Sequence, residues 1–339
     1  MDKEISIRLQ KYILHILDSN MHMPVLSDRE HPLDDEISEY LESHIDRIFK
    51  DEGLRDARFN GEDNRIYSLL GEIINDGEQF STLTGEIALI LFDIMKRNVD
   101  IPSCDLVMCT FTVNNVLHMG LLKFNYRPSF IHYVHAFEEG RVNTIVKQKT
   151  SLPGESQKVD ECAVINLEDW SIKLLEKKYE INGEKVFYMS ELFLDCSSRM
   201  SPKEKAKIFK KATESFNKKY YEGDVDTAIE IKKAVNESLD RSEAIDIVEV
   251  AEQAFRSSPE MRSTYIEHVE KAGLTDKAIR VGESTAGKTF RRQRIKTDTG
   301  IEINIPMEYY RNNRKVEFIN NIDGTVSILI KDAGKIIGM

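Results

Sequence analysis

The hydrophobic period of the chain changes near residue 105, and this change restricts the possible folds more than any other feature. Between residues 34 and 97, apolar side chains recur every three to four positions, as they do in amphipathic helices. From residue 105 to 150, four β-rich runs are separated at Asn114-Asn115, Arg127-Pro128 and Glu139-Gly140. The pattern predicts N-terminal helices followed by a four-stranded antiparallel meander.

The second half of the chain predicts helices first and then short strands. Asn182-Gly183 is a strong hairpin signal. Ser201-Pro202, followed by Glu204, has the residues of a helix N-terminus and opens a block of three to four packed helices. Short β-rich runs then return around a turn at Asp298-Thr299-Gly300. We therefore predict an α+β fold: an antiparallel sheet with N-terminal helices, a central helical block and a small C-terminal β module, with domains at 1–198, 199–280 and 281–339.

The charge of the chain is unevenly distributed. The 339 residues carry 47 basic and 58 acidic side chains, a formal net charge of -11. That balance argues against a nucleic-acid partner, because phosphate binding requires concentrated lysine and arginine. Residues 281–339 are the exception, with 10 basic and 7 acidic side chains. The C-terminal segment alone is basic, so any phosphate-binding surface is expected mainly there.

The sequence predicts a cytoplasmic protein that does not cross a membrane. The N-terminal residues lack the apolar stretch and cleavage site of a signal peptide. No apolar run approaches the roughly 20 residues of a membrane-spanning helix. The four cysteines, Cys104, Cys109, Cys162 and Cys196, include no CxxC pair, so we expect buried thiols and no zinc knuckle.

The most basic string is KTFRRQRIK, residues 288–296, with five positive charges and no negative one. On a strand, Lys288, Arg292, Arg294 and Lys296 would share one face with Phe290, because side chains alternate. Such a ribbon could follow a phosphate backbone. The alternative is an edge strand whose charges prevent aggregation.

Two further groups of lysines are candidates. The helix expected from Pro202 to Tyr220 has a lysine face, which suits phosphate contact or ordinary solvation. A sparser group surrounds the turn at residues 151–154. The candidate nucleic-acid-binding residues are therefore Lys288, Arg291, Arg292, Arg294, Lys296, Lys147, Lys149, Lys207 and Lys211.

The string GESTAGKT, Gly282 to Thr289, matches the phosphate-binding P-loop pattern. A P-loop requires a buried strand before it and a helix after it, and neither is evident here. We therefore predict a glycine-containing loop, while a nucleotide-dependent enzyme remains an alternative. His132 and His135 would lie on opposite faces of a strand, and no hydrolase signature occurs. The sequence predicts no catalytic residue, no metal site and no cofactor.

Three strings resemble the bacterial 37-kilodalton nucleoid-associated protein family of the NdpA or YejK type. They begin VNTIVKQKTSLPGESQK at Val142, KKYEINGEKVFYMSELFLDC at Lys177 and RIKTDTGIEINIPMEYY at Arg294. The resemblance implies a cytoplasmic, nucleoid-located protein that binds double-stranded DNA and is not an enzyme. Because the chain is acidic, a nucleoid adaptor that acts through protein contacts remains an alternative. A homodimer is also compatible with the predicted edge strands.

Overall fold

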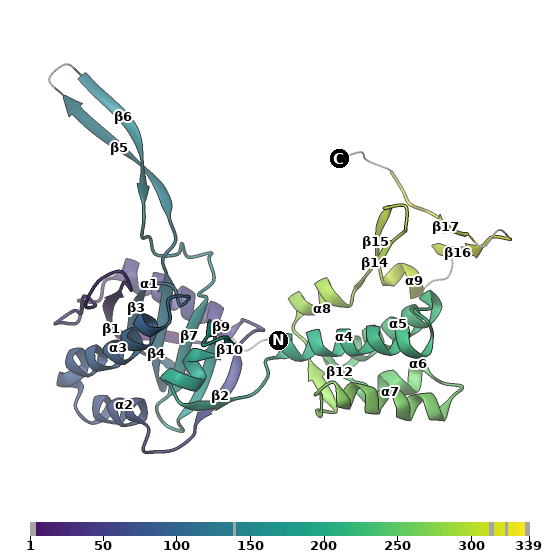
Figure 1. The fold of residues 1–339 in the computed structure, drawn as a ribbon, viewed down its shortest axis with the longest axis horizontal. Helices are drawn as coiled ribbons and strands as arrows, with labels where there is room; N and C mark the ends of the chain where they lie inside the picture. Colours follow the sequence, from purple (N-terminus) through teal and green to yellow (C-terminus); the bar gives the residue numbers. More distant parts are fainter. Residues whose placement is uncertain (1–4, 138–139, 312–314, 323–324, 336–339) are drawn as a thin grey trace. The chain divides into compact units, whose positions relative to one another are not determined.

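The structure is a computed structural model that describes residues 5–137, 140–311, 315–322 and 325–335. The chain divides into two compact units, residues 1–200 and 201–339, and each is described by itself. The first unit is built on an antiparallel sheet with helices, and the second contains a helical block and small strand pairs (Figure 1). The predicted α+β class is therefore confirmed. The three domain boundaries predicted from the sequence remain predictions.

A seven-stranded antiparallel sheet forms the first unit. Its order is β1-β3-β4-β7-β8-β2-β11, so β1 and β11 are the edge strands. Strands far apart in the sequence lie side by side, because β2 comes before β3 in the chain but pairs with β8. The strands are β1 (Ile7–Leu17), β2 (Arg55–Phe59), β3 (Cys104–Val113), β4 (Val116–Asn125), β7 (Glu161–Asn166), β8 (Ser171–Leu175) and β11 (Cys196–Ser198).

Helices cover both faces of this sheet. Alternate residues of β3 enter different clusters: Leu106 and Met108 pack with α2 and α3, whereas Val107 and Phe111 pack with α1. A sheet buried on both faces needs apolar residues at nearly every position, which explains the continuous apolar runs of β3 and β4. The helical elements are α1 (Asp35–Phe49), α2 (Arg65–Asn75), η1 (Gly77–Gln79), α3 (Phe80–Arg97) and η2 (Met189–Phe193).

Two of the four strands expected in the meander leave the sheet. Strands β5 (Ser129–Phe137) and β6 (Gly140–Gln148) pair only with each other and project from the first unit as a hairpin, here called the arm (Figure 1). The predicted four-stranded meander is therefore wrong at this point, because β4 pairs with β7 instead of β5. All four runs are strands, but the alternation of apolar and polar residues within each run does not indicate which other strand it pairs with.

A buried ion pair joins β4 to β7 and favours their pairing over pairing of β4 with β5. Lys123 of β4 and Glu161 of β7 are both fully buried and lie 2.9 Å apart, Nζ to Oε2. Asn125 Nδ2 and Tyr179 Oη also donate to that oxygen, at 3.1 and 3.0 Å. A buried ammonium requires a charged partner, and β5 contains no acidic residue. We call Lys123, Asn125, Glu161 and Tyr179 the clamp; it lies where the segment carrying the arm leaves and re-enters the sheet.

The hairpin predicted at Asn182-Gly183 is confirmed. It joins β9 (Tyr179–Ile181) to β10 (Glu184–Val186). The φ angles of Asn182 and Gly183 are 53° and 83°, which an Asn-Gly turn adopts readily. The hairpin positions Tyr179 so that its hydroxyl donates a hydrogen bond to Glu161.

The second unit begins with the predicted helical block. Ser201 and Glu204 form a reciprocal capping box at the start of α4. Short strands follow the block, as expected. In the described part of the chain, no helix is long and apolar enough to span a membrane. The elements are α4 (Pro202–Tyr220), α5 (Val225–Ser242), β12 (Ala244–Asp246), α6 (Ile247–Ala254), α7 (Pro259–Lys271), β13 (Ala278–Arg280), α8 (Glu283–Thr289), β14 (Arg292–Lys296), β15 (Glu302–Pro306), α9 (Glu308–Arg311), β16 (Val316–Asn320) and β17 (Val326–Ile330).

We predict that breaking the clamp destabilises the first unit. Lys123→Met leaves the Glu161 carboxylate buried without a counter-charge, which should lower the free energy of unfolding by about 3–5 kcal/mol. The double variant Lys123→Met/Glu161→Leu should recover most of that loss. The control is Lys173→Met, which removes a surface ion pair with Asp56 and should cost less than about 1 kcal/mol. Urea unfolding measures all three, and equal losses in the two single variants would contradict this role.

Stability should also depend on His15. The ring is buried, its Nδ1 accepts a hydrogen bond from the Ser27 amide and its Nε2 lies 3.2 Å from Thr84 Oγ1. Burial lowers the pKa of His15 to about 4, so the folded state binds a proton less readily than the unfolded state. This stabilisation is complete above the unfolded pKa near 6.5 and is lost as pH falls towards 4.

The corresponding measurement is the free energy of unfolding at pH 7 and pH 5. His15 should contribute a decrease of about 2 kcal/mol between these two values. His15→Gln should remove that part of the decrease, whereas His22→Gln, at an exposed position, should leave the profile unchanged. A wild-type slope in the His15→Gln variant would show that His15 does not titrate in this range.

Candidate nucleic-acid interface

Strand β14 carries the core of the predicted basic ribbon. Arg292 and Lys296 are four positions apart on this strand and therefore belong to the same face. Ile295 belongs to the other face and packs with isoleucines of β15 and with Ile229 of α5. The strand is thus held on the second unit through its apolar face, which leaves the face with the charged positions on the other side.

The expected four-charge face is shorter than predicted. Lys288 lies in α8, before the strand begins, and is exposed. Phe290 is buried and its ring centroid lies 6.1 Å from that of Phe209 in α4. This contact draws the chain into the core and ends the helix, so β14 starts only at Arg292. The ribbon therefore has three charged positions, not four.

Two exposed cations near β14, Arg291 and Lys296, have weak partners among the described residues. Arg291 lies 3.9 Å from Asp240, and Lys296 lies 3.5 Å from Glu302. Their side chains are 53% and 68% exposed, and exposed ion pairs of this kind contribute about 0–1 kcal/mol, so phosphate can compete for them. Arg292 is exposed and has no ion pair with a described residue. The side chain of Arg294 lies outside the described residues.

Helices α4 and α5 add two lysines beside this strand. The Lys232 ammonium donates to the carbonyl oxygen of Arg292 at 3.3 Å. Burial lowers the pKa of Lys232, the positive charge of nearby Lys210 lowers it further, and the negative charge of Glu214 partly opposes this shift. Lys210 of α4, Lys232 of α5 and the backbone of Arg292 therefore lie near one another, with Glu214 of α4 beside them. We call Lys210, Lys232, Arg291 and Arg292 the basic corner.

Sequence reasoning missed Lys232 and placed Lys210 only among the lysines of a solvated face. In the sequence, the neighbour of Lys232 is Lys233, which pairs with Glu230 at 2.7 Å, so the segment resembles an ordinary charged helix face. Only the packing of β14 against α5 distinguishes Lys232 from Lys233. Lys210 itself lies 3.8 Å from Glu214, an exposed pair.

The remaining predicted lysines lie elsewhere. Lys207 and Lys211 are exposed on α4, but each is two residues from Phe209 and therefore points away from the side that contacts Phe290. Lys147 and Lys149 are exposed in the first unit, the former on β6 of the arm. The structure thus brings Arg291 and Arg292 together with Lys210 and Lys232, and not with Lys207 or Lys211.

The string GESTAGKT forms helix α8, not the glycine-containing loop predicted from the sequence. Gly282 is the N-cap residue and Gly287 lies inside the helix. A P-loop instead needs these residues in an open loop whose amides surround the phosphates. The preceding strand β13 pairs antiparallel with β12 in a two-stranded sheet. The residues of the motif are present, but the loop that would hold a nucleotide is not formed.

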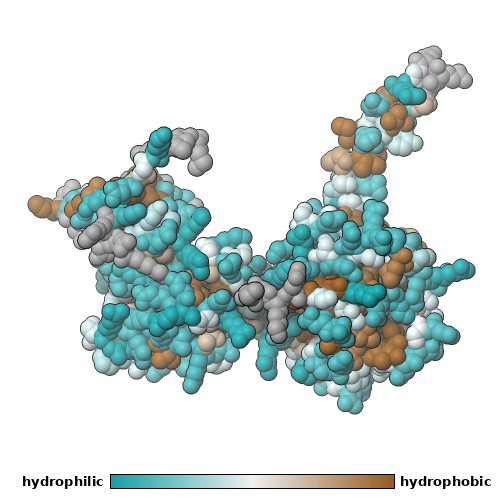
Figure 2. All heavy atoms as spheres, turned by 180° about the vertical axis from the view of Figure 1, so that it is seen from behind, coloured by the Kyte–Doolittle hydropathy of each residue, from teal (hydrophilic) through white to brown (hydrophobic). Residues whose placement is uncertain are grey.

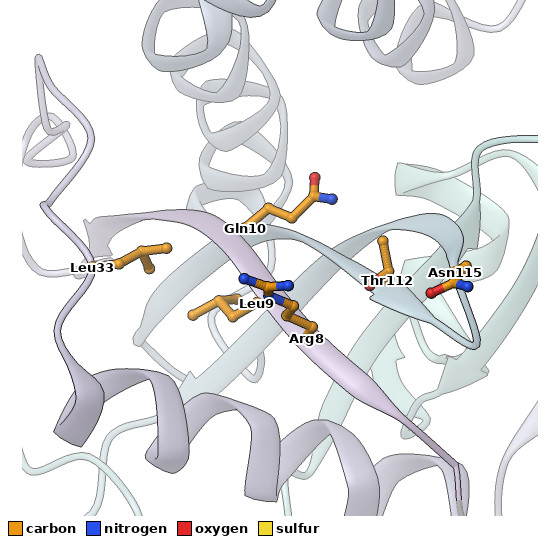
Figure 3. A pocket seen from close by; sticks show the side chains of 6 residues that line it. All are labelled: Arg8, Leu9, Gln10, Leu33, Thr112 and Asn115. Atoms are coloured by element: carbon orange, nitrogen blue, oxygen red, sulfur yellow. The ribbon is translucent and has the colours of Figure 1, made fainter.

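A pocket in the first unit is lined by few side chains that could bind a ligand or catalyse a reaction. It lies beside β1 and β3, and its lining includes one charged side chain, Arg8 (Figure 3). Within the described residues, no three His, Cys, Asp or Glu side chains are grouped closely enough to hold a metal ion. The lining residues are Arg8, Leu9, Gln10, Leu33, Thr112 and Asn115.

The fold and the basic corner define a two-unit α+β protein with a cationic surface on an acidic chain. A family model described as nucleoid-associated protein YejK matches residues 13–336. The chain therefore belongs to the YejK family of nucleoid-associated proteins, and the resemblance found in the sequence is confirmed. A search of curated proteins finds no match.

A glycine substitution tests the conformation of GESTAGKT. A methyl group on Gly287 would contact nothing within 4 Å. Gly287→Ala should therefore raise the free energy of unfolding by about 0.5–1 kcal/mol, because alanine favours a helix. The control Gly300→Ala should instead destabilise, since Gly300 has a φ of 91°. Loss of stability in Gly287→Ala, measured by urea unfolding, would argue that this string does not form a helix.

Proposed function

We propose that this nucleoid-associated protein binds double-stranded DNA directly, through the sugar-phosphate backbone, at the basic corner and the charged face of β14. The observation that supports the proposal is the placement of Lys232 against the backbone of Arg292, with Lys210 of a third element nearby and the Arg292 side chain exposed. Glu214 and Asp240 offset the repulsion among these cations only through exposed contacts of 3.8 and 3.9 Å, so an anionic ligand would stabilise the group further. In this proposal the protein acts in the cytoplasm on the nucleoid and does not catalyse a reaction.

The spacing of β14 suits a phosphate backbone. Alternate residues of a strand are about 6.6 Å apart, close to the separation of neighbouring phosphates on one DNA strand. Arginine also binds phosphate through two parallel hydrogen bonds, which favours Arg292 as the central contact. These contacts address the backbone and carry no sequence information. Binding should therefore be independent of sequence.

The acidic remainder of the chain limits the proposed DNA contact to a small surface. With a net charge of -11, most of the surface repels DNA, so only the basic corner and its surroundings can approach it. A small number of phosphates is then neutralised. If that number is about four, the logarithm of the binding constant should fall with the logarithm of salt with a slope near -3.6.

We expect paired alanine substitutions to locate the interface. Arg292→Ala/Lys296→Ala should weaken binding to a mixed-sequence duplex at least tenfold and make the salt slope shallower by about 1.8, because two phosphate contacts are lost. The control Arg256→Ala/Lys271→Ala removes the same net charge at exposed positions near and on α7 and should bind like the wild type. Mobility-shift titrations at several salt concentrations measure both.

The outcome separates direct from indirect association with DNA. Equal losses in the two double variants would mean that net charge, and not β14, governs binding. Failure of the wild-type chain to bind duplex at about 50–200 mM salt would contradict direct binding and favour the adaptor alternative.

A further inference from the structure

The arm has two faces of different chemistry. Paired residues of an antiparallel hairpin lie on the same face, so the register assigns every side chain. One face presents Ile131, Tyr133, Val142 and Val146 and contains no charged residue among those described. The opposite face includes Arg141 and Lys147, beside Ile145, which is 77% exposed. Figure 2 shows hydrophobic side chains along the length of this projecting hairpin.

The two edges of the arm also differ. Exposed edges of β-sheets usually carry charges that prevent pairing with another strand. Strand β6 has Arg141 and Lys147, but the nine residues of β5, SFIHYVHAF, contain no Lys, Arg, Asp, Glu or Pro. Within the described chain, β5 pairs with β6 alone. The outer edge of β5 is therefore a long, apolar edge without the usual protection.

We propose that β5 pairs with β5 of a second copy of this chain, antiparallel and across a two-fold axis. Pairing over the full nine residues places Tyr133 against Tyr133 of the second copy. Phe130 then faces Ala136, and His132 faces Val134. We call this contact between the two β5 strands the seam. No acidic or basic residue meets another in the seam, so the edge is complementary to itself. The result is a four-stranded sheet with β6 of each copy on the outside.

The charges of the two strands favour β5–β5 pairing over two alternatives, which are binding of the arm to DNA and pairing of β6 with β6. Strand β5 supplies no cation for phosphate, whereas DNA binding depends on lysine and arginine. Pairing of β6 with β6 would place Arg141 opposite Lys147, and like charges directly opposite are destabilising. Of the two strands of the arm, only β5 can pair with itself over its full length without such repulsion.

The size of the seam sets the expected strength. Nine residues span about 30 Å, and a pairing of two hairpins buries less than the roughly 1,200 Å² of a typical stable interface. About eight backbone hydrogen bonds would join the strands, because alternate residues point towards the seam. We therefore expect a reversible dimer that dissociates on dilution through the micromolar range.

Cysteine cross-linking in the full-length chain tests the register. In the proposed dimer the two Cα atoms of residue 133 are about 4.5–5.5 Å apart, within the range of a disulfide. Tyr133→Cys should therefore form a covalent dimer under mild oxidation. Thr144→Cys is the matched control, since Thr144 lies directly opposite Tyr133 on the same face. Its two copies would be about 14 Å apart, too far to link. The four native cysteines are buried, which limits background cross-linking.

Charge insertion provides a second test that needs no covalent bond. Val134→Lys places charges in the seam and should raise the dimer dissociation constant at least tenfold in sedimentation velocity. Ile145→Lys makes a similar change on the same face of the arm, but on β6, and should leave the dimer intact. Both positions are exposed, so the melting temperature should not change.

Several outcomes would overturn the proposal: a wild-type chain that stays monomeric at high micromolar concentration, equal cross-linking of the two cysteine variants, or equal dissociation of the two lysine variants. A monomer whose arm binds a different protein would likewise exclude the second copy as the occupant. Arg292→Ala/Lys296→Ala should leave the dimer unchanged, so failure of this proposal is distinct from failure of DNA binding.

Discussion

The buried contact between Lys123 and Glu161 governs the arrangement of the first unit. A lysine at a fully covered position of β4 would be strongly destabilising without its carboxylate, and the carboxylate lies 38 residues further along the chain. This pair joins β7 to β4, and the segment between the two strands lies outside the sheet. Outside the clamp, Arg127 and Asp160 lie 2.7 Å apart and join the same two chain ends at the surface. The arm thus begins and ends where charged contacts join β4 to β7.

Helices cover both faces of the sheet but not the arm, so the apolar residues of the sheet strands and those of the arm differ in role. Strands β3 and β4 are apolar throughout because α1 covers one face and α2 and α3 cover the other. The arm has no such cover, yet many of its residues are also apolar. An exposed ribbon of this composition suits contact with another protein surface. In the second unit, by contrast, β14 has its apolar side on α5 and its charged positions on the other side.

Local signals in the sequence predicted much of this fold, and long-range choices escaped them. The Ser201 capping box and the Asn182-Gly183 turn depend on residues within three or four positions, so they could be identified correctly. The partner of β4 depends on a charge pair 38 residues apart, which no local period reveals. The basic corner shows the same limit, because Lys232 joins Arg292 only through packing of β14 on α5. The P-loop pattern failed for a related reason: residue identity alone does not determine whether Gly287 lies in a loop or in a helix.

The proposed dimer contact and the proposed DNA contact would strengthen DNA binding together. In the proposed DNA complex, one copy of the chain would neutralise few phosphates, and its acidic remainder would oppose binding. Two copies joined through their arms would carry two basic corners, so binding of the first would raise the effective concentration of the second near the same DNA. Linked weak sites can exceed either affinity by orders of magnitude while each contact remains rapidly reversible. Because the proposed dimer would dissociate on dilution, occupancy of DNA would then rise more steeply than linearly with the concentration of the protein.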